Sequence, residues 1–333
     1  MKFLIIRFSS IGDIVLTTPV IRCLKQQIPN AKIHFLSKYS FKNIIEHNPY
    51  IDKLLLLDND WDVLMHRLKL EEYDYIIDLH HNLRTLKVKR HLKVRSFSFN
   101  KLNIKKWLLT ALKINRLPNK HIVDRNLETV KYFNVENDGL GLDYFIPEKD
   151  IVQIKDIPAA QRMGFIAIVI GAALNTKKLP THKLMELCNL IQHPIILLGG
   201  PEDKEIGNEI AKQDEIKIYN ACGKFNLNES ADLVRKSKFV ITHDTGLMHI
   251  AAAFKKPIIS IWGNTIPAFG MNAYYGNKTV ENEIFEVGNL NCRPCSKIGY
   301  KACPKKHFKC MQQQDIKAIS AVASNWSIQF HNK

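Results

Sequence analysis

Short apolar runs alternate with amphipathic segments along the first half of the chain. The runs typical of buried strands are Lys2–Arg7, Ile33–Ser37, Lys53–Leu57 and Tyr75–Leu79. After the first run, apolar residues at helical spacing from Ile14 to Leu24 predict a helix that ends near Pro29, and Phe41–His47 predicts another. Because parallel strands need crossover connections, this order predicts parallel strands joined by helices.

The same alternation restarts in the second half. The expected strands are Phe165–Ile170, Pro194–Leu198, Ile216–Ile218, Phe239–Thr242 and Pro257–Trp262. The expected helices are Leu184–Ile191, Glu205–Lys212, Glu229–Lys236, Gly246–Phe254 and Asp315–Gln329. A polar stretch between Pro147 and Pro158 indicates the joint. The fold class is therefore α/β, with doubly wound domains at residues 1–155 and 156–314, and we expect the segment 315–333 to pack back on the first domain.

The composition is that of a globular protein. Of 333 residues, 46% are hydrophobic and 24% charged, which excludes a mainly disordered chain, and the glycines and prolines show no fibrous period. The N-terminus has no signal-peptide pattern, and no uncharged run approaches the roughly 18 residues of a membrane span. We therefore expect a cytoplasmic protein.

Positive charge is concentrated in one segment. The net charge is +16, and between Leu79 and Val123 there is no acidic residue among many lysines and arginines. Such a segment attracts polyanions, namely nucleic acid, an anionic membrane or a phosphorylated glycolipid, although a merely solvated basic surface is the alternative.

The first candidate for chemistry is the turn Ser9-Ser10-Ile11-Gly12-Asp13, where the first strand meets the first helix. Gly12 allows a close backbone approach, and Asp13 falls at the helix start. Helix capping alone would explain an aspartate there. Neighbouring amides would also lower its pKa, which suits a general base that must be ionised at neutral pH.

A second candidate is the segment from His243 to Ala253, in which a strand runs into a helix that opens with Asp244-Thr245-Gly246. Free amides at this helix start would bind a phosphate, and Gly246 removes the Cβ that would block it. His249 would lie on the first turn, near a bound anion, or be a core histidine.

Two further loops follow strands of the second half. Thr176-Lys177-Lys178-Leu179-Pro180 carries two lysines, of which one would neutralise phosphate. Gly199-Gly200-Pro201-Glu202-Asp203 is acidic and suits ribose hydroxyls. The chain has neither a Walker A loop nor a dinucleotide glycine fingerprint, which argues against a nicotinamide enzyme.

These four motifs occur in the order and spacing of the bacterial ADP-heptose lipopolysaccharide heptosyltransferases, glycosyltransferase family 9, which the chain resembles over nearly its whole length. The resemblance implies a GT-B architecture of two Rossmann-like domains facing across a cleft, the first for the acceptor and the second for the nucleotide sugar. It also implies inverting transfer without a metal ion.

The resemblance further implies residue roles. Asp13 is the expected general base, and Lys177 the second catalytic residue, which stabilises the departing diphosphate. The expected donor-binding residues are Ser10, Gly12, Lys177, Glu202, Asp244, Thr245, Gly246 and His249. From charge alone, Arg84, Lys87 and Arg90 are expected to bind an anionic glycolipid acceptor, with the protein in peripheral contact with the inner membrane.

Two patterns could concern metals. Asp58-Asn59-Asp60-Trp61-Asp62 contains Asp-x-Asp pairs, the metal signature of a different glycosyltransferase fold, but a polar turn explains it better. The spacing of Cys292, Cys295, Cys303 and Cys310 would suit a structural zinc, with free thiols as the alternative. No catalytic metal or other cofactor is expected, and Cys23, Cys188 and Cys222 are typical core thiols.

The sequence thus favours a glycosyltransferase that moves a heptose or related sugar from an ADP-sugar to a lipopolysaccharide core or related glycolipid. Two alternatives stay open. A GT-B-like sugar-nucleotide epimerase would share the fold but act on the donor alone. A nucleic-acid-binding protein would explain the charge but not the phosphate-binding motifs, and the basic segment lacks interleaved aromatics for base stacking.

Overall fold

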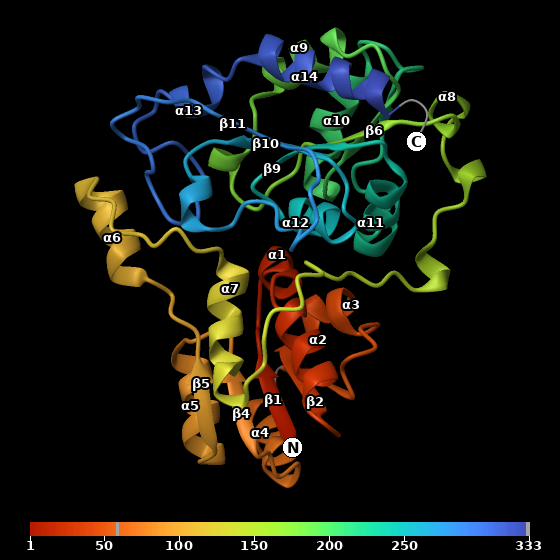
Figure 1. The fold of residues 1–333 in the computed structure, drawn as a ribbon. Coiled ribbons are helices and arrows are strands. Elements are labelled where there is room, and N and C mark those ends of the chain that lie inside the picture. The colour runs from red at the N-terminus through yellow and green to blue at the C-terminus, as the bar shows by residue number, and fades with distance from the viewer. Residues whose placement is uncertain (58–59, 331–333) are drawn as a thin grey trace. The chain divides into compact units, whose positions relative to one another are not determined.

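A computed structural model describes residues 1–57 and 60–330 (Figure 1). The chain divides into two compact units. Unit 1 comprises Met1–Leu102, Asn119–Phe145 and Tyr274–Lys278, and unit 2 comprises Asn103–Pro118, Ile146–Ala273 and Thr279–Lys333. The chain therefore crosses between the units more often than a single linker near residue 155 would require.

Unit 1 contains a parallel sheet with the strand order β3-β2-β1-β4-β5. Its strands are β1 (Lys2–Ile6), β2 (Lys32–Lys38), β3 (Lys53–Leu57), β4 (Tyr75–Asp78) and β5 (Arg95–Ser98). Its α-helices in the described residues are α1 (Ile11–Val15), α2 (Thr18–Gln27), α3 (Lys42–Ile45), α4 (Trp61–Leu70), α5 (Leu83–Leu92) and α7 (Ile122–Leu127). β1 is central: Phe3 is in register with Ile33 of β2 and with Tyr75 of β4.

Unit 2 contains a parallel sheet with the order β11-β10-β9-β6-β7-β8. Its strands are β6 (Ile166–Val169), β7 (Ile195–Leu198), β8 (Ile218–Asn220), β9 (Val240–His243), β10 (Ile258–Trp262) and β11 (Asn282–Glu286). Its α-helices in the described part are α6 (Asn103–Leu112), α8 (Ala159–Arg162), α9 (Thr181–Leu190), α10 (Lys204–Ala211), α11 (Leu227–Lys236), α12 (Gly246–Ala253), α13 (Lys309–Gln312) and α14 (Ile316–Gln329). The predicted α/β class with two doubly wound parallel sheets is confirmed.

The helix expected from Ile14 to Leu24 is two helices. Chain direction changes at Thr17, whose hydroxyl donates to the Ile14 carbonyl at 2.6 Å, and Pro19 stands in the first turn of α2. Proline fits a first turn because it has no N–H to donate. The short α1 is what places Asp13 directly behind β1.

The C-terminal helix belongs to unit 2, where we had expected it to pack on the first domain. Ile316, Ile319 and Ala323 of α14 are buried in the core of unit 2, and Trp326 packs edge-on against Phe239 with ring centroids 5.5 Å apart. In Figure 1, α14 runs beside α9, with which it is in contact. The apolar face of α14 explains this position, because it completes the cover of the second sheet. No helix in the described residues is both long and apolar enough to cross a bilayer.

Candidate functional site

The candidate residues of unit 1 gather where its strand order reverses. The chain proceeds from β1 to β2 and β3 on one side and returns to β4 and β5 on the other, so β1 and β4 flank the switch point. In open parallel sheets, ligands bind at the carboxyl edge beside this point. Asp13 follows β1 and His80 follows β4, which places both at this edge.

Asp13 is the third residue of α1 and is held by two neighbours. Its Oδ1 lies 2.7 Å from the Arg7 guanidinium, and its Oδ2 accepts from the Ser10 hydroxyl at 2.8 Å and from the Ser10 amide at 3.3 Å. The last contact is half of a capping box, with Ser10 as the N-cap. The capping contact leaves Oδ1 of Asp13 on Arg7, so a chemical role for Asp13 stays a prediction, and the adjacent Gly12 is buried.

The surroundings set the ionisation of this site. Burial by itself raises the pKa of Asp13, but the Arg7 charge and the Ser10 hydrogen bonds outweigh it and hold the pKa below its usual value. Burial, with the charges of Arg7 and Lys101, lowers the pKa of His80 to about 4. At neutral pH the site therefore holds an ionised carboxylate and an uncharged imidazole.

Arg7 is fixed on three sides. Besides Asp13, it donates to the Ser9 carbonyl at 2.7 Å and to the Leu79 carbonyl at the end of β4. Its guanidinium also lies 5.9 Å from the centre of the Phe99 ring. Sequence reasoning missed Arg7 because it follows a buried strand as an ordinary terminal charge. The sequence signal that could have indicated Arg7 is a cationic residue six positions before the candidate aspartate.

The candidate residues of unit 2 gather at the equivalent point, between β6 and β9. Lys177, in the 3-10 turn Asn175–Lys177 after β6, forms an ion pair with Asp244 after β9, with Nζ 2.6 Å from Oδ2. Thr265, which follows β10, donates to the same carboxylate oxygen at 2.9 Å. Two predicted donor residues thus meet across the switch point, and Thr265 is a partner that the sequence did not indicate.

The first turn of α12 presents backbone donors. Thr245 is its N-cap in an extended conformation, but no side chain caps the helix, and the Thr245 hydroxyl instead lies 3.2 Å from that of Thr242. Gly246 opens the helix without a Cβ. These amides form the kind of site that binds phosphate. His249 lies one turn further on and is only 2% exposed, so a place beside a bound anion stays a prediction for it.

The neighbouring loops support this edge. Lys178 forms an ion pair with the buried Asp203 at 2.7 Å, and Asp203 also accepts from the Gly200 amide at 3.0 Å. A Cβ on Gly171 would lie 2.3 Å from Asp203 Oδ2, so only glycine fits there. Glu202 is exposed beside this network, in the turn Pro201–Asp203 after β7. The three predicted donor loops of unit 2 therefore follow the adjacent strands β9, β6 and β7.

Two buried polar residues lie near the carboxyl edge of the second sheet, His243 and Asn264. His243 accepts from the Leu179 amide at 3.0 Å, and burial lowers its pKa to about 3, so the ring stays neutral. Asn264, next to Thr265, is 2% exposed, and within the described residues neither polar atom of its side chain has a hydrogen-bond partner. Buried polar atoms normally have partners, so Asn264 joins the candidate ligand contacts.

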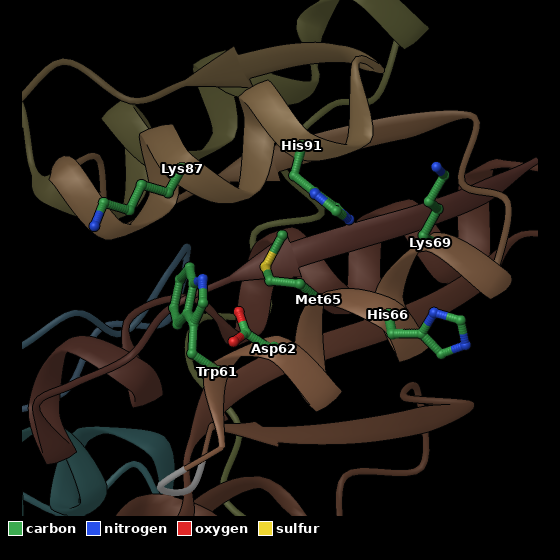
Figure 2. Close-up of a pocket in the computed structure, with 7 residues that line it drawn as sticks. All are labelled: Trp61, Asp62, Met65, His66, Lys69, Lys87 and His91. Carbon is green, nitrogen blue, oxygen red and sulfur yellow. The ribbon is translucent and has the colours of Figure 1, made fainter.

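The predicted acceptor residues all lie on α5 and are exposed. Lys87 lines a groove of about 450 Å³ between α4 and α5, whereas Arg84 and Arg90 do not. Figure 2 shows Lys87 and His91 of α5 lying across from residues of α4. The residues of α4 that line the groove are Trp61, Asp62, Met65, His66 and Lys69. The groove thus combines two lysines, Lys69 and Lys87, with the apolar side chains of Trp61 and Met65, a combination compatible with an anionic amphiphile.

The Asp-x-Asp segment acts as a helix start. Asp60 caps α4 by accepting from the Val63 amide at 2.9 Å, which agrees with a polar turn. Asp62 lines the groove described above. Asp58 and Asn59 lie outside the described residues.

The cysteine cluster is looser than a zinc site requires. Cys292 Sγ lies 3.7 Å from His307 Nε2, but in the part of the chain that the structure describes no three His, Cys, Asp or Glu side chains are arranged to hold a metal ion. Of the two readings of Cys292, Cys295, Cys303 and Cys310, a structural zinc site or free thiols, the described residues show free cysteines. Cys23, Cys188 and Cys222 are buried, as expected of core thiols.

The chain is similar to known proteins. The model of the family described as glycosyltransferase family 9 (heptosyltransferase) matches residues 61–305. Lipopolysaccharide heptosyltransferase 1 of Campylobacter coli is 27% identical over 315 residues, which cover 86% of this chain and 90% of the relative.

Solved structures share the fold. The structure of an Escherichia coli ADP-heptose lipopolysaccharide heptosyltransferase II matches with a TM-score of 0.75 and 18% identity, covering 99% of both chains. An E. coli heptosyltransferase, WaaC, solved with ADP matches with a TM-score of 0.68 and 20% identity, covering 98% of this chain and all of the other. The likeness extends over both sheets.

Proposed function

The chain belongs to glycosyltransferase family 9, the heptosyltransferase family, and from this premise we propose that it moves a heptose or related sugar from an ADP-sugar to the core of a lipopolysaccharide or related glycolipid. A relative acts as a lipopolysaccharide heptosyltransferase, and a similar structure was solved with ADP, which supports both substrates. The family favours a glycosyltransferase over the epimerase and nucleic-acid-binding alternatives.

One observation carries the proposal. At the switch point of each sheet, a carboxylate of a candidate motif forms an ion pair with a nearby cation: Asp13 with Arg7 in unit 1, and Asp244 with Lys177 in unit 2. Switch points are where open parallel sheets bind ligands. Charged groups at both switch points suit a reaction in which a proton leaves one substrate and a diphosphate leaves the other.

The proposed chemistry is a single displacement. Asp13 takes the proton of the acceptor hydroxyl while its oxygen bonds to the anomeric carbon, and the bond from that carbon to ADP breaks with inversion. Lys177 and the amides at the start of α12 take up the negative charge of the departing diphosphate, so that no metal ion is required for this task.

Donor and acceptor contacts complete the proposal. Ser10, Gly12, Glu202, Asp244, Thr245, Gly246 and His249 bind the donor. Arg84, Lys87 and Arg90 meet the phosphates and acidic sugars of the acceptor, with Lys87 in the groove between α4 and α5. Because that acceptor is lipid-linked, the enzyme works in the cytoplasm at the periphery of the inner membrane.

The experiment that tests the proposal is Asp13→Asn. We expect ADP-sugar binding to stay within a few-fold of the native value, while the transfer rate falls by about 10²–10⁴-fold, the usual contribution of a general base. Donor binding is measured by thermal shift, and transfer by single-turnover kinetics with a phosphorylated glycolipid acceptor.

The matched control is Asp214→Asn. Asp214 is exposed and accepts from the Lys217 amide at 2.9 Å, so it also serves as a local cap but lies outside the site. This variant should transfer normally. An Asp13→Asn enzyme as active as the control would rule out Asp13 as the base.

A further inference from the structure

Helix α6 exposes its apolar side chains to solvent. Ile104 is 76% exposed, Trp107 57% and Leu112 53%, while Leu109 is the buried residue of the helix. Apolar residues of surface helices normally face the core. An amphipathic helix with this orientation needs a partner that the unit itself does not supply.

The exposed apolar residues of α6, together with the half-buried Leu108, form a continuous stripe. Positions 104, 107, 108, 111 and 112 follow the i, i+3, i+4, i+7, i+8 spacing and so share one helix face. The residues are Ile104, Trp107, Leu108, Ala111 and Leu112; we call them the α6 stripe. Trp107 is the residue type that prefers the boundary between lipid and water.

The opposite face of α6 anchors the helix to unit 2. Lys106 lies 5.7 Å from the centre of the Phe269 ring. Lys113, just after the helix, donates to the carbonyls of Cys292 and Pro294 at 3.1 and 2.9 Å. Lys297 donates to the Asn103 side chain at 3.3 Å. These contacts use the polar face, and therefore the stripe is directed away from the unit.

A loop of the cysteine-containing segment is held at the start of α6 by the bond from Lys297 to Asn103. The next residue of this loop, Ile298, is also apolar and is 62% exposed. The segment bonded to the helix start therefore carries a further exposed apolar side chain, although it is nearly two hundred residues away in sequence.

Charge identifies the occupant. Lys105 and Arg116 are exposed beside the stripe, and the whole segment from Leu79 to Val123 has no acidic residue. We propose that α6 is a membrane-docking helix that inserts the α6 stripe into the interfacial region of an anionic lipid bilayer, with Lys105 and Arg116 at the headgroups. Apolar stripe, tryptophan and flanking cations together match interfacial helices.

The inference rests on the proposed lipid-linked acceptor but is tested without substrates. The full chain is incubated with vesicles of phosphatidylethanolamine and about one-third phosphatidylglycerol, an anionic surface, and bound protein is measured by flotation. The stripe variant carries Ile104→Ser, Trp107→Ser and Leu112→Ser. Its partition coefficient should fall by about thirtyfold or more, because three large side chains lose their lipid contacts.

A matched control variant carries Met163→Ser, Ile216→Ser and Ile328→Ser. These side chains are 92%, 78% and 78% exposed in the same unit, but they are not in α6. The control should bind vesicles as the native chain does. In a further variant, Lys105→Glu with Arg116→Glu, the partition coefficient on anionic vesicles should fall by about tenfold. The native chain should bind zwitterionic vesicles no more strongly than this variant binds anionic ones.

Trp107 provides a local readout. Of the four tryptophans, Trp262 and Trp326 are buried, Trp61 is half-buried and Trp107 is 57% exposed. Quenching by brominated lipid should therefore report mainly on Trp107, and Trp107→Phe should remove most of it. Equal vesicle binding by the native chain and the stripe variant would overturn the proposal, as would equal loss in the control. So would a native dimer that the stripe variant converts to a monomer, because a second copy would then be the occupant. Transfer to a soluble acceptor analogue separates this outcome from failure of the proposed function.

Discussion

The ion pair between Arg7 and Asp13 leads to a prediction about pH. Arg7→Gln removes the positive charge beside the proposed base. Burial, which raises the pKa of Asp13, is then opposed only by the Ser10 hydrogen bonds. The pKa of Asp13 should therefore rise, and the acid limb of the pH profile of kcat/KM should move to higher pH, because the base must be ionised before it can accept a proton.

The size of the change follows from the geometry. Two unit charges about 4 Å apart interact by about 4 kcal/mol at an effective dielectric constant of about 20. The Asp13 side chain is 22% exposed, so solvent screening leaves about half of this, or about 2 kcal/mol. Since about 1.4 kcal/mol corresponds to one pH unit, the acid limb should move up by about one to two units.

The assay is kcat/KM across the pH range at fixed ionic strength. Arg7→Lys is the matched control, because it keeps the charge and should keep the acid limb near that of the native enzyme. Thermal unfolding checks both variants, since Arg7 also bonds the carbonyls of Ser9 and Leu79. If folded Arg7→Gln enzyme has the native pH profile, Asp13 is not the group whose ionisation limits the reaction.

Two further predictions concern the substrates. Lys177→Met should weaken ADP binding by about tenfold to a hundredfold, because it removes a charge-assisted hydrogen bond. Binding is measured by thermal shift, and the control is Lys183→Met, since Lys183 pairs with Glu186. Equal thermal shifts of the two variants with ADP would contradict a contact between Lys177 and the diphosphate. Combined Arg84→Glu, Lys87→Glu and Arg90→Glu should lower kcat/KM for a phosphorylated glycolipid by at least about tenfold with ADP binding intact, and unchanged turnover would remove α5 from the acceptor site.

The sequence predicted the central strands well because they are buried on both faces. β6 is a continuous apolar run, and β1 and β10 are apolar except for Lys2 at the start of β1 and Ser260 within β10, which is close to the pattern that such strands produce. β5 and β11 were missed because they are edge strands with mostly polar or exposed residues, Arg95–Ser98 and Asn282–Glu286. At an edge, pairing with one neighbour suffices and no apolar run is needed.

The site could be predicted only in part, because the sequence shows local features but not which distant segments meet. Asp13 and Asp244 are visible because a strand runs into a helix through a short polar turn, which sequence shows directly. Thr265, the partner of Asp244, becomes visible only when neighbouring strands are aligned, since register decides which loops meet. Arg7 lies in the same β1–α1 segment as Asp13 and was missed because it resembles an ordinary charge at the end of a strand. The apolar residues of α6 were likewise indistinguishable from a core-facing stripe, because spacing shows that residues share a face but not which way it points.

The two ion pairs differ in a way that fits two different tasks. Arg7 holds Asp13 while also bonding two backbone carbonyls, so its planar guanidinium is fixed and the carboxylate stays oriented. Lys177 contacts Asp244 through one flexible ammonium group, with the Asp244 carbonyl 3.3 Å away as its other contact. An arriving diphosphate carries more charge than a carboxylate, so the ammonium can turn toward it while Thr265 keeps a hydrogen bond to Asp244. A base must keep its geometry through the reaction, whereas a group that meets a leaving diphosphate must change partners as the charge appears, and the chain has arginine at the first position and lysine at the second.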